Sequence, residues 1–195
     1  MLVSGLQRRQ AGFTLVELMI VVIVVAVLLT VAAPSMLNLL QKNRLQTAAD
    51  NFYAALMAAR SEAVKINLPV VICKSSDGAA CVLSGNWEQG WLMYADLDSD
   101  STKDPSDPIL RVGEALKSGD TLRVRSAPGA AGGAFANLLV YRNDGSSSGT
   151  TGTEAFVFCD AAKNLITARE ILVTLTGRPR RQPMTTTTTT TTCPI

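Results

Sequence analysis

A nearly unbroken apolar run at residues 13–33 is the feature that most constrains this chain. The run reads FTLVELMIVVIVVAVLLTVAA, and from Leu18 to Ala33 its single polar residue is Thr30. As a helix these residues reach about 31 Å at ~1.5 Å per residue, close to the ~30 Å thickness of a bilayer's hydrocarbon core. We therefore predict a transmembrane helix segment over residues 13–34. The arginines in the basic leader before it favour an inside location for the N-terminus.

A carboxylate near the start of the apolar run needs an explanation. Glu17 would cost about 3 kcal/mol deep in a membrane and less near its boundary. Residues 1–12 do not follow the order of a secretory signal, because the small residues Ala11 and Gly12 precede the apolar run. If the chain were cut between Gly12 and Phe13, the new amine of one molecule could pair with Glu17 of its neighbour. That pair would neutralise the charge and set the register of packed helices. The alternative is a boundary residue that snorkels to water.

The charge balance and the absence of histidine exclude several classes of function. The chain has 18 basic and 16 acidic residues, a net charge of +2, and no histidine. Without the two leader arginines the charges balance, so any affinity for nucleic acid must come from a local cluster. The usual metal ligand and the commonest general base are missing. Ser61 and Glu62 are adjacent on a predicted helix and cannot face each other. We expect no enzyme and no cofactor.

Helical spacing continues beyond the apolar run. Apolar residues recur at steps of three and four up to Ile66, and Pro69 follows. This pattern predicts that residues 35–67 form the amphipathic second half of one long helix, which packs one face on a domain. The residues of the predicted buried face are Leu45, Ala48, Phe52, Ala55, Leu56, Ala59, Ala63 and Ile66.

The remainder reads as strands separated by loops rich in Gly, Ser, Asp and Pro. The predicted strands cover residues 69–74, 90–96, 121–125, 137–142, 154–160 and 169–176. No room is left for crossover helices, so the sheets should be antiparallel. We predict a β-rich domain over 68–184. The threonine-rich segment 185–195 is predicted to be a C-terminal tail, an extended spacer with a glycosylated stalk as the alternative.

The N-terminal residues resemble a known signature. GFTLVELMIVVIVVAVLLTVAAP is similar to the start of type IV pilins and type II secretion pseudopilins. In that family a prepilin peptidase cuts after the glycine, here Gly12, and methylates the new N-terminal residue, here Phe13. The resemblance assigns Glu17 to assembly and identifies Pro34 as the proline that loosens the helix.

Up to about residue 181, the chain intermittently resembles the GspH/FimT group of minor pilins and pseudopilins, and within it the FimT-type (FimU-like) minor pilins. The threonine run falls outside this pattern. The matching stretches are MAARSEAVKINLPVVIC, GNWEQGWLMYADLDSD, PILR, FVFCD and LTGRPRR. The resemblance implies an α+β type IV pilin fold, in which a long N-terminal helix packs on antiparallel β-sheets. The residues that match the helix motif and the strand motif are Arg60, Glu62, Ala63, Val64, Lys65, Trp87, Gly90, Trp91, Tyr94 and Asp96.

Four cysteines allow three disulfide connectivities. The resemblance and the spacing both favour Cys73–Cys81 and Cys159–Cys193. The second bond would tether the C-terminal tail to the strand around FVFCD. The segment GRPRRQ would then form a held loop. A metal site is not expected at these cysteines, because their spacing is not C-x-x-C and histidine is absent.

Three arginines gather near the C-terminus. Arg178, Arg180 and Arg181 follow Gly177, and no acidic residue occurs from Ile171 to Ile195. Guanidinium forks suit phosphate oxygens, and three phosphate contacts give weak binding without sequence preference. The alternative is a solvated basic turn, or a surface that pairs with acids of a neighbouring subunit.

The Gly-Arg-x-Arg motif marks FimT-type minor pilins linked to DNA uptake, and the resemblance therefore implies that Gly177, Arg178 and Arg180 bind DNA. Arg181 adds a charge beyond the motif. Proline at the variable position departs from it. Lys163, Arg123 and Arg125 could extend the basic surface, although a solvated strand face explains the last two equally well.

An acidic loop follows the Trp-and-Gly strand. Asp96, Asp98 and Asp100 have a D-x-D-x-D spacing that suggests calcium. An EF-hand would continue with Gly and end with Glu at its twelfth position, whereas this loop has Ser101 and Asp107 there. We expect a solvated turn rather than a metal site.

The function implied is that of a minor type IV pilin built into a pilus, which binds extracellular DNA for uptake in natural transformation. The alternatives are a minor pseudopilin of a type II secretion system and a minor pilin that primes assembly without binding DNA. The implied partners are other pilins, the prepilin peptidase, an assembly platform protein with its ATPase, and DNA. The implied location is the bacterial inner membrane, single-pass with a periplasmic domain, and then the extracellular pilus.

Overall fold

The computed structural model describes residues 12–126, 130–131, 133–149, 153–163, 165, 167–184 and 193. The leader up to residue 11 and the threonine run at 185–192 lie outside the described residues. The chain divides into two compact units, residues 1–40 and 41–195. Helix α1, Leu15–Ile66, contributes to both.

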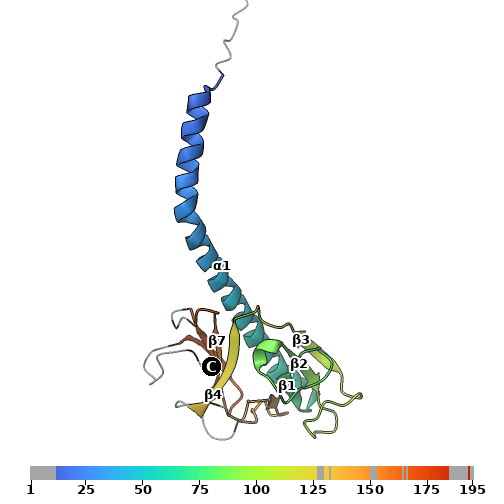
Figure 1. The fold of residues 1–195 in the computed structure, drawn as a ribbon. Helices are drawn as coiled ribbons and strands as arrows, with labels where there is room; N and C mark the ends of the chain where they lie inside the picture. Colours follow the sequence, from blue (N-terminus) through green and yellow to red (C-terminus); the bar gives the residue numbers. More distant parts are fainter. Residues whose placement is uncertain are drawn as a thin grey trace, which may run out of the picture. The chain divides into compact units, whose positions relative to one another are not determined.

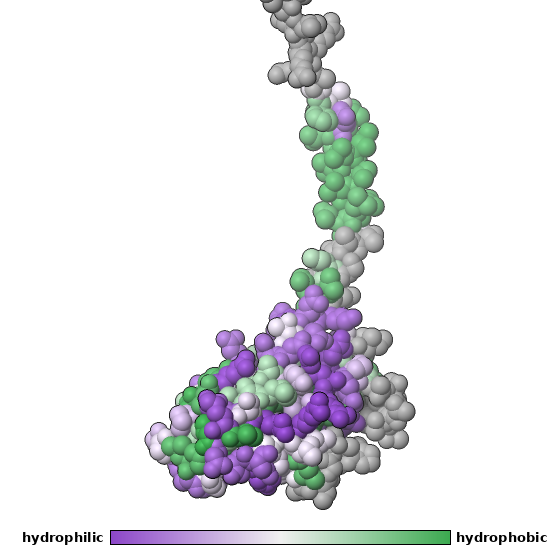
Figure 2. All heavy atoms as spheres, turned by 180° about the vertical axis from the view of Figure 1, so that it is seen from behind, coloured by the Kyte–Doolittle hydropathy of each residue, from purple (hydrophilic) through white to green (hydrophobic). Residues whose placement is uncertain are grey.

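The first part of α1 is apolar on all sides. Its large side chains between Leu15 and Leu29 are exposed, and Figure 2 shows this part as an almost continuous hydrophobic surface. The Thr30 hydroxyl donates to the carbonyl oxygen of Val27 at 2.7 Å, so its polar hydrogen is satisfied within the helix. The helix runs on through Pro34. In the described part of the chain, no helix is long and apolar enough to cross a membrane.

The second part of α1 buries one face, as its spacing predicts. Leu45, Phe52 and Leu56 are buried there, together with small residues that allow close packing: Ala49, Ala55, Ala59 and Ala63. The helix ends where Asn67 adopts a positive φ of 58°, a left-handed conformation common after a helix C-terminus. Pro69 follows, and strand β1 begins at Val70.

Two antiparallel sheets follow the helix (Figure 1). The first has the order β3-β2-β1-β6. Its strands are β1 Val70–Lys74, β2 Trp91–Ala95, β3 Ile109–Gly113 and β6 Leu138–Tyr141, and the 3-10 helix η1 Trp87–Gln89 precedes β2. The second has the order β5-β4-β7-β8-β9. Its strands are β4 Thr121–Ser126, β5 Ala130–Ala131, β7 Thr153–Cys159, β8 Arg169–Thr174 and β9 Pro179–Pro183.

Each of the six predicted strands occurs, and the antiparallel pairing is confirmed. The prediction of a held loop at GRPRRQ is wrong from Pro179 onward, because residues 179–183 form the edge strand β9. Its main chain pairs with β8, and prolines are tolerated at an edge where no further strand needs their missing N–H.

The core lies between the helix and both sheets. The ring of Phe52 packs edge-on against four aromatic rings, with centroid distances of 4.8–5.9 Å. Two of these rings, Trp87 and Trp91, precede and begin β2, and the other two, Phe156 and Phe158, belong to β7. One helix residue thus joins both sheets, and edge-to-face geometry adds to the hydrophobic gain.

Both favoured disulfides are present. Cys73 bonds Cys81, and Cys159 bonds Cys193. Cys193 is buried in a small apolar cluster with Cys159, Ala155 and Val157. The chain beyond β9 is therefore fastened to the middle of the second sheet.

Candidate functional site

The turn between β8 and β9 presents the motif glycine and the first arginine. Gly177 has a φ of +73° and is buried, and its N–H donates to the Thr174 carbonyl at 2.8 Å. A Cβ atom at this position would overlap the carbonyl oxygen of Gly145. Only glycine satisfies both the left-handed backbone and this close approach.

Two residues from outside the hairpin, Arg60 and Ser147, hold this turn in place. The Arg60 guanidinium donates to the carbonyls of Gly145 at 3.0 Å and Thr176 at 3.4 Å. Ser147 donates from its N–H to Leu175 at 3.0 Å and from its hydroxyl to Thr174 at 2.9 Å. The turn is therefore anchored to the helix and to the loop after β6. Sequence reasoning missed this role of Arg60, although its place in the helix motif was noted.

The three arginines differ in their surroundings. Arg178 and Arg180 are exposed, and neither side chain forms an ion pair or hydrogen bond with any residue that the structure describes. In the hairpin register Arg180 lies opposite Leu172, whereas Arg181 lies opposite the buried Ile171. Successive side chains of a strand point to opposite faces, so Arg180 and Arg181 are directed away from each other.

Arg181 is occupied by the helix. Its guanidinium forms an ion pair with Asp50 and lies over the ring of Tyr53, 4.5 Å from the centroid. A hydrogen bond from Gln46 and the charge of Arg181 lower the pKa of Asp50 below its ordinary value. Arg181 thus serves as an anchor of β9 on α1, a role that the sequence pattern did not separate from that of Arg178 and Arg180.

The other residues suggested to extend the basic surface also differ in whether an acidic side chain pairs with them. Arg123 and Arg125 share a face of β4, as expected, but Arg123 pairs with Glu88 and Arg125 pairs with the buried Glu170. These pairs neutralise the two guanidinium groups. Lys163 is exposed, and its amine has no ion pair among the described residues. Among the described residues after Glu170, the positive charge without an ion pair therefore lies at Arg178 and Arg180.

The residues Gly12, Phe13 and Glu17, which the sequence predicts to serve processing and assembly, lie at the start of the described chain. Gly12 and Phe13 are exposed, Phe13 at 85%. Thr14 precedes the helix, and its hydroxyl accepts the Glu17 N–H at 3.2 Å. Thr14 and Glu17 have the T-x-x-E spacing of a capping box, a sequence signal that predicts the start of the helix at this position. A carboxylate in the first turn also complements the helix dipole.

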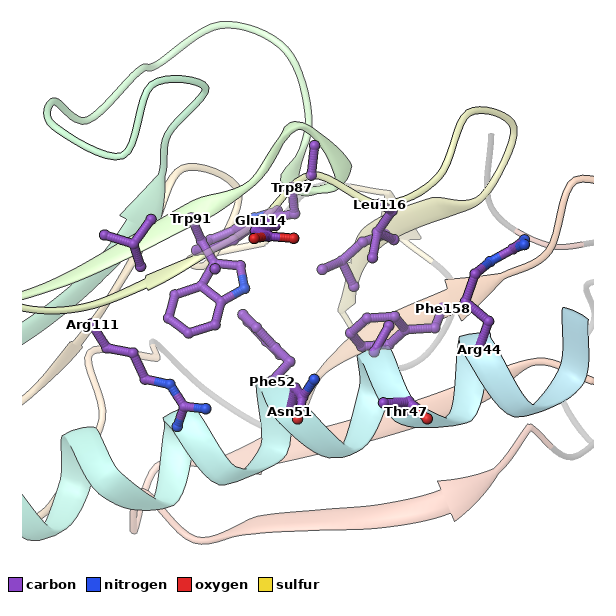
Figure 3. A pocket seen from close by; sticks show the side chains of 15 residues that line it. Arg44, Thr47, Asn51, Phe52, Trp87, Trp91, Arg111, Glu114, Leu116 and Phe158 are labelled. Atoms are coloured by element: carbon purple, nitrogen blue, oxygen red, sulfur yellow. The ribbon is translucent and has the colours of Figure 1, made fainter. Parts of the chain in front are cut away.

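A cleft of about 610 Å³ opens between the second part of α1 and the β3 region. Figure 3 shows the rings of Phe52, Trp91 and Phe158 directed into it, with Arg111 and Arg44 on opposite sides. Arg44 pairs with Asp120 at 2.8 Å. The cleft thus lies over nearly buried core rings and has a guanidinium group at each side, and sequence reasoning did not predict it.

The predicted acidic residues lie between β2 and β3. Asp96 is fully buried, while Asp98 and Asp100 are exposed. The solvated turn expected from the sequence therefore describes Asp98 and Asp100 but not Asp96.

Two sequence families match this chain. The profile of the type II transport protein GspH matches residues 48–177. The chain belongs to the GspH family. The prokaryotic N-terminal methylation motif matches residues 7–33. Together they imply a membrane-anchored pilin or pseudopilin that assembles with other pilins. The GspH family is one of structural pilins and pseudopilins and is not a known enzyme family.

Solved structures confirm the fold of this GspH family member. The type IV minor pilin FimU of Pseudomonas aeruginosa (strain PAO1) is 24% identical with a TM-score of 0.53, covering 73% of this chain and 90% of FimU. The minor pseudopilin EpsH of the Vibrio cholerae type II secretion system is 12% identical with a TM-score of 0.53, covering 74% of this chain and 99% of EpsH. The shared fold is the type IV pilin fold. Comparison with curated proteins gives no significant match.

Proposed function

We propose that this chain is a minor type IV pilin that binds extracellular DNA through Arg178 and Arg180 and thereby serves DNA uptake. The observation that carries the proposal is the pair of exposed arginines without partners among the described residues, next to a turn that Gly177, Arg60 and Ser147 hold in place. Arg181 contributes less to DNA binding, because Asp50 already partners it.

The chemistry of these arginines fits the DNA backbone. A guanidinium group donates two parallel hydrogen bonds to phosphate oxygens and stays charged at any physiological pH. The chain as a whole is close to neutral, with a net charge of +2, so attraction to DNA depends on this local group. Two phosphate contacts give non-specific binding with a log–log salt slope of about −2 on duplex DNA.

The same proposal covers assembly. A prepilin peptidase cuts after Gly12 and methylates Phe13, and the chain is held in the bacterial inner membrane with its β-rich domain in the periplasm. Glu17 then pairs with the Phe13 amine of a neighbouring pilin, and the helix loosens at Pro34 as subunits pack. An assembly platform protein and its ATPase supply the motion. The N-terminal methylation motif at residues 7–33 supports this part of the proposal.

A charge-matched comparison tests the DNA site. In full-length protein in detergent, we expect Arg178→Gln with Arg180→Gln to weaken duplex DNA binding at least about tenfold at low salt and to flatten the salt slope by about 2. Lys42→Gln with Lys117→Gln removes the same charge from exposed lysines elsewhere, and we expect a change within about twofold. Equal losses for the two double variants would show that net charge, not this site, attracts DNA.

Asp50→Asn provides the converse test. It removes the charge that holds Arg181 while keeping an oxygen that can accept from Gln46. Removing this carboxylate raises the positive charge beside β9 by one, so DNA binding should strengthen by up to a few-fold and the salt slope should steepen by no more than about 1. Fluorescence anisotropy at several salt concentrations measures both quantities.

The second candidate is a minor pseudopilin of a type II secretion system, favoured by the match to the type II transport protein GspH. A minor pilin that primes assembly without binding DNA is a third. Deletion of the gene separates the first two functions: loss of transformation with normal export supports DNA uptake, whereas loss of exported enzymes supports secretion. Priming is supported if the deletion also abolishes pili and the arginine variants bind DNA as the unchanged protein does.

A further inference from the structure

The β2–β3 loop brings aspartates together that are well separated along the chain. One carboxylate oxygen from each of Asp96, Asp98 and Asp107 lies within 4.8 Å of the others. A second group, Asp98, Asp100 and Asp104, meets the same limit and shares Asp98. In a loop counted from Asp96, Asp107 is the twelfth residue, where an EF-hand places its closing carboxylate.

Two of these carboxylates are out of contact with water. Asp96 is 0% exposed and Asp107 is 3% exposed. Both oxygens of Asp107 accept backbone hydrogen bonds, from Leu97 at 3.0 Å and from Asp104 at 2.9 Å. Asp96 Oδ2 accepts from the Ser101 N–H at 2.9 Å. The backbone therefore fixes the direction of both side chains.

One carboxylate oxygen of Asp96 has no partner in the loop that compensates for its burial. Its Oδ1 is buried and has no hydrogen-bond partner among the described residues. A carboxylate oxygen of Asp98 lies within 4.8 Å of one from Asp96. A buried carboxylate oxygen that faces another acid is costly, because neither water nor a donor compensates its charge. Such an oxygen is stabilised only when a hydrogen-bond donor or a cation lies beside it.

Among the described residues, the charge of Lys103 acts on Asp107, but no lysine or arginine forms an ion pair with Asp96 or Asp98. None of the five ion pairs between described residues includes an aspartate of this loop. The Lys103 amine donates to the Asp104 backbone carbonyl at 2.6 Å and lies over the Tyr94 ring. The Tyr94 hydroxyl is also buried without a partner among the described residues.

We propose that Asp96, Asp98 and Asp107 form a calcium site that fixes the β2–β3 loop on the surface of the β-rich domain. The ligands are hard carboxylate oxygens with no sulfur or imidazole, a set that suits calcium rather than zinc or copper. Asp96 and Asp107 are buried and oriented by the backbone, and the exposed Asp98 closes the site from the solvent side. The site is separate from the arginines of the proposed function.

Calcium titration of the full-length protein in detergent, stripped with EDTA, tests the site. We expect one calcium per chain with a Kd between about 10⁻⁵ and 10⁻³ M, the range of sensors and extracellular modules. At a concentration of about 100 times Kd, the midpoint of thermal unfolding should rise by about 5–10 °C. Absence of both binding heat and a thermal shift at about 10 mM calcium overturns the proposal, as does an equal shift with magnesium.

Two variants with a matched control sharpen the test. Asp98→Asn changes an exposed side chain and should weaken calcium binding at least about tenfold, while Glu114→Gln, an exposed acid outside the loop, should bind as the unchanged protein does. Asp96→Asn removes the buried charge, so its unfolding midpoint in EDTA should be equal or higher while its response to calcium disappears. Equal calcium affinity in Asp98→Asn and Glu114→Gln overturns the proposal. Arg178→Gln with Arg180→Gln should leave calcium binding unchanged, which separates this site from the DNA site.

Discussion

At the scale of single residues, Gly177 is the position where side-chain chemistry is most restricted. We predict that Gly177→Ala lowers the free energy of unfolding by about 2 kcal/mol or more, because alanine is strained at a φ of +73° and its Cβ overlaps the Gly145 carbonyl. Gly149→Ala is the matched control, since its nearest neighbour would be the Phe135 ring at 3.4 Å. Denaturant unfolding of both variants measures the difference. A Gly177→Ala protein as stable as Gly149→Ala would contradict this account of the turn.

The arginines show what residue identity alone could and could not predict. Their proximity in sequence and the excess of positive charge near the C-terminus were visible. Which of them is free depends on the register of β9 on β8, which directs Arg181 to the helix and Arg180 away from it. The partners of Arg123 and Arg125, Glu88 and Glu170, come from distant parts of the chain. No spacing rule identifies such pairs, because the fold brings them together.

At the scale of elements, the anchoring of the β8–β9 turn on the helix yields the next prediction. Arg60→Met keeps the apolar stem but removes the hydrogen bonds to Gly145 and Thr176. We expect a loss of about 1–3 kcal/mol in stability, and faster hydrogen exchange at the Gly177 amide than in the unchanged protein. Arg178→Met serves as the control, because its side chain has no partner among the described residues. Unchanged exchange at Gly177 in Arg60→Met would show that Ser147 alone holds the turn.

The helix and six of the strands could be predicted because their buried residues leave a pattern of apolar side chains in the sequence. The helix end was marked by Pro69, and the six predicted strands are apolar runs bounded by turn residues. Strand β3 was missed because its side chains are largely exposed, so no alternation marks it. Strand β9 was missed because a basic segment flanked by prolines resembles a loop, and its strand character comes from main-chain pairing with β8. The order of the strands within the first sheet could not be predicted from the sequence, since β1 pairs with both β2 and the distant β6.

At the scale of the whole molecule, the apolar first part of α1 and the disulfide-bonded β-rich domain are stabilised in different ways. The side chains from Leu15 to Leu29 are exposed along the helix, and a surface of this kind is stable in water only when lipid or other protein covers it. The domain has its own core around Phe52, closed at the far end of the chain by Cys159–Cys193. Folding of the domain and coverage of the helix are therefore separable properties, and a variant can disturb one without the other.

Glu17 allows that separation to be tested. Within the described residues its backbone N–H is capped by Thr14, so Glu17 could act by supporting the helix end or by pairing with the amine of a neighbouring subunit. Thr14→Ala removes the capping oxygen and keeps the carboxylate, whereas Glu17→Gln keeps the cap and removes the charge. If the neighbour's amine is the partner, Glu17→Gln should reduce incorporation into filaments at least about tenfold while Thr14→Ala assembles nearly normally. Both variants should retain the unfolding midpoint of the β-rich domain, because residues 41–195 form a separate compact unit. Immunoblotting of sheared filaments against whole-cell protein measures incorporation. A loss in Thr14→Ala as large as that in Glu17→Gln would contradict the pairing of Glu17 with a neighbour's amine, because Thr14→Ala keeps the carboxylate and weakens only the helix cap.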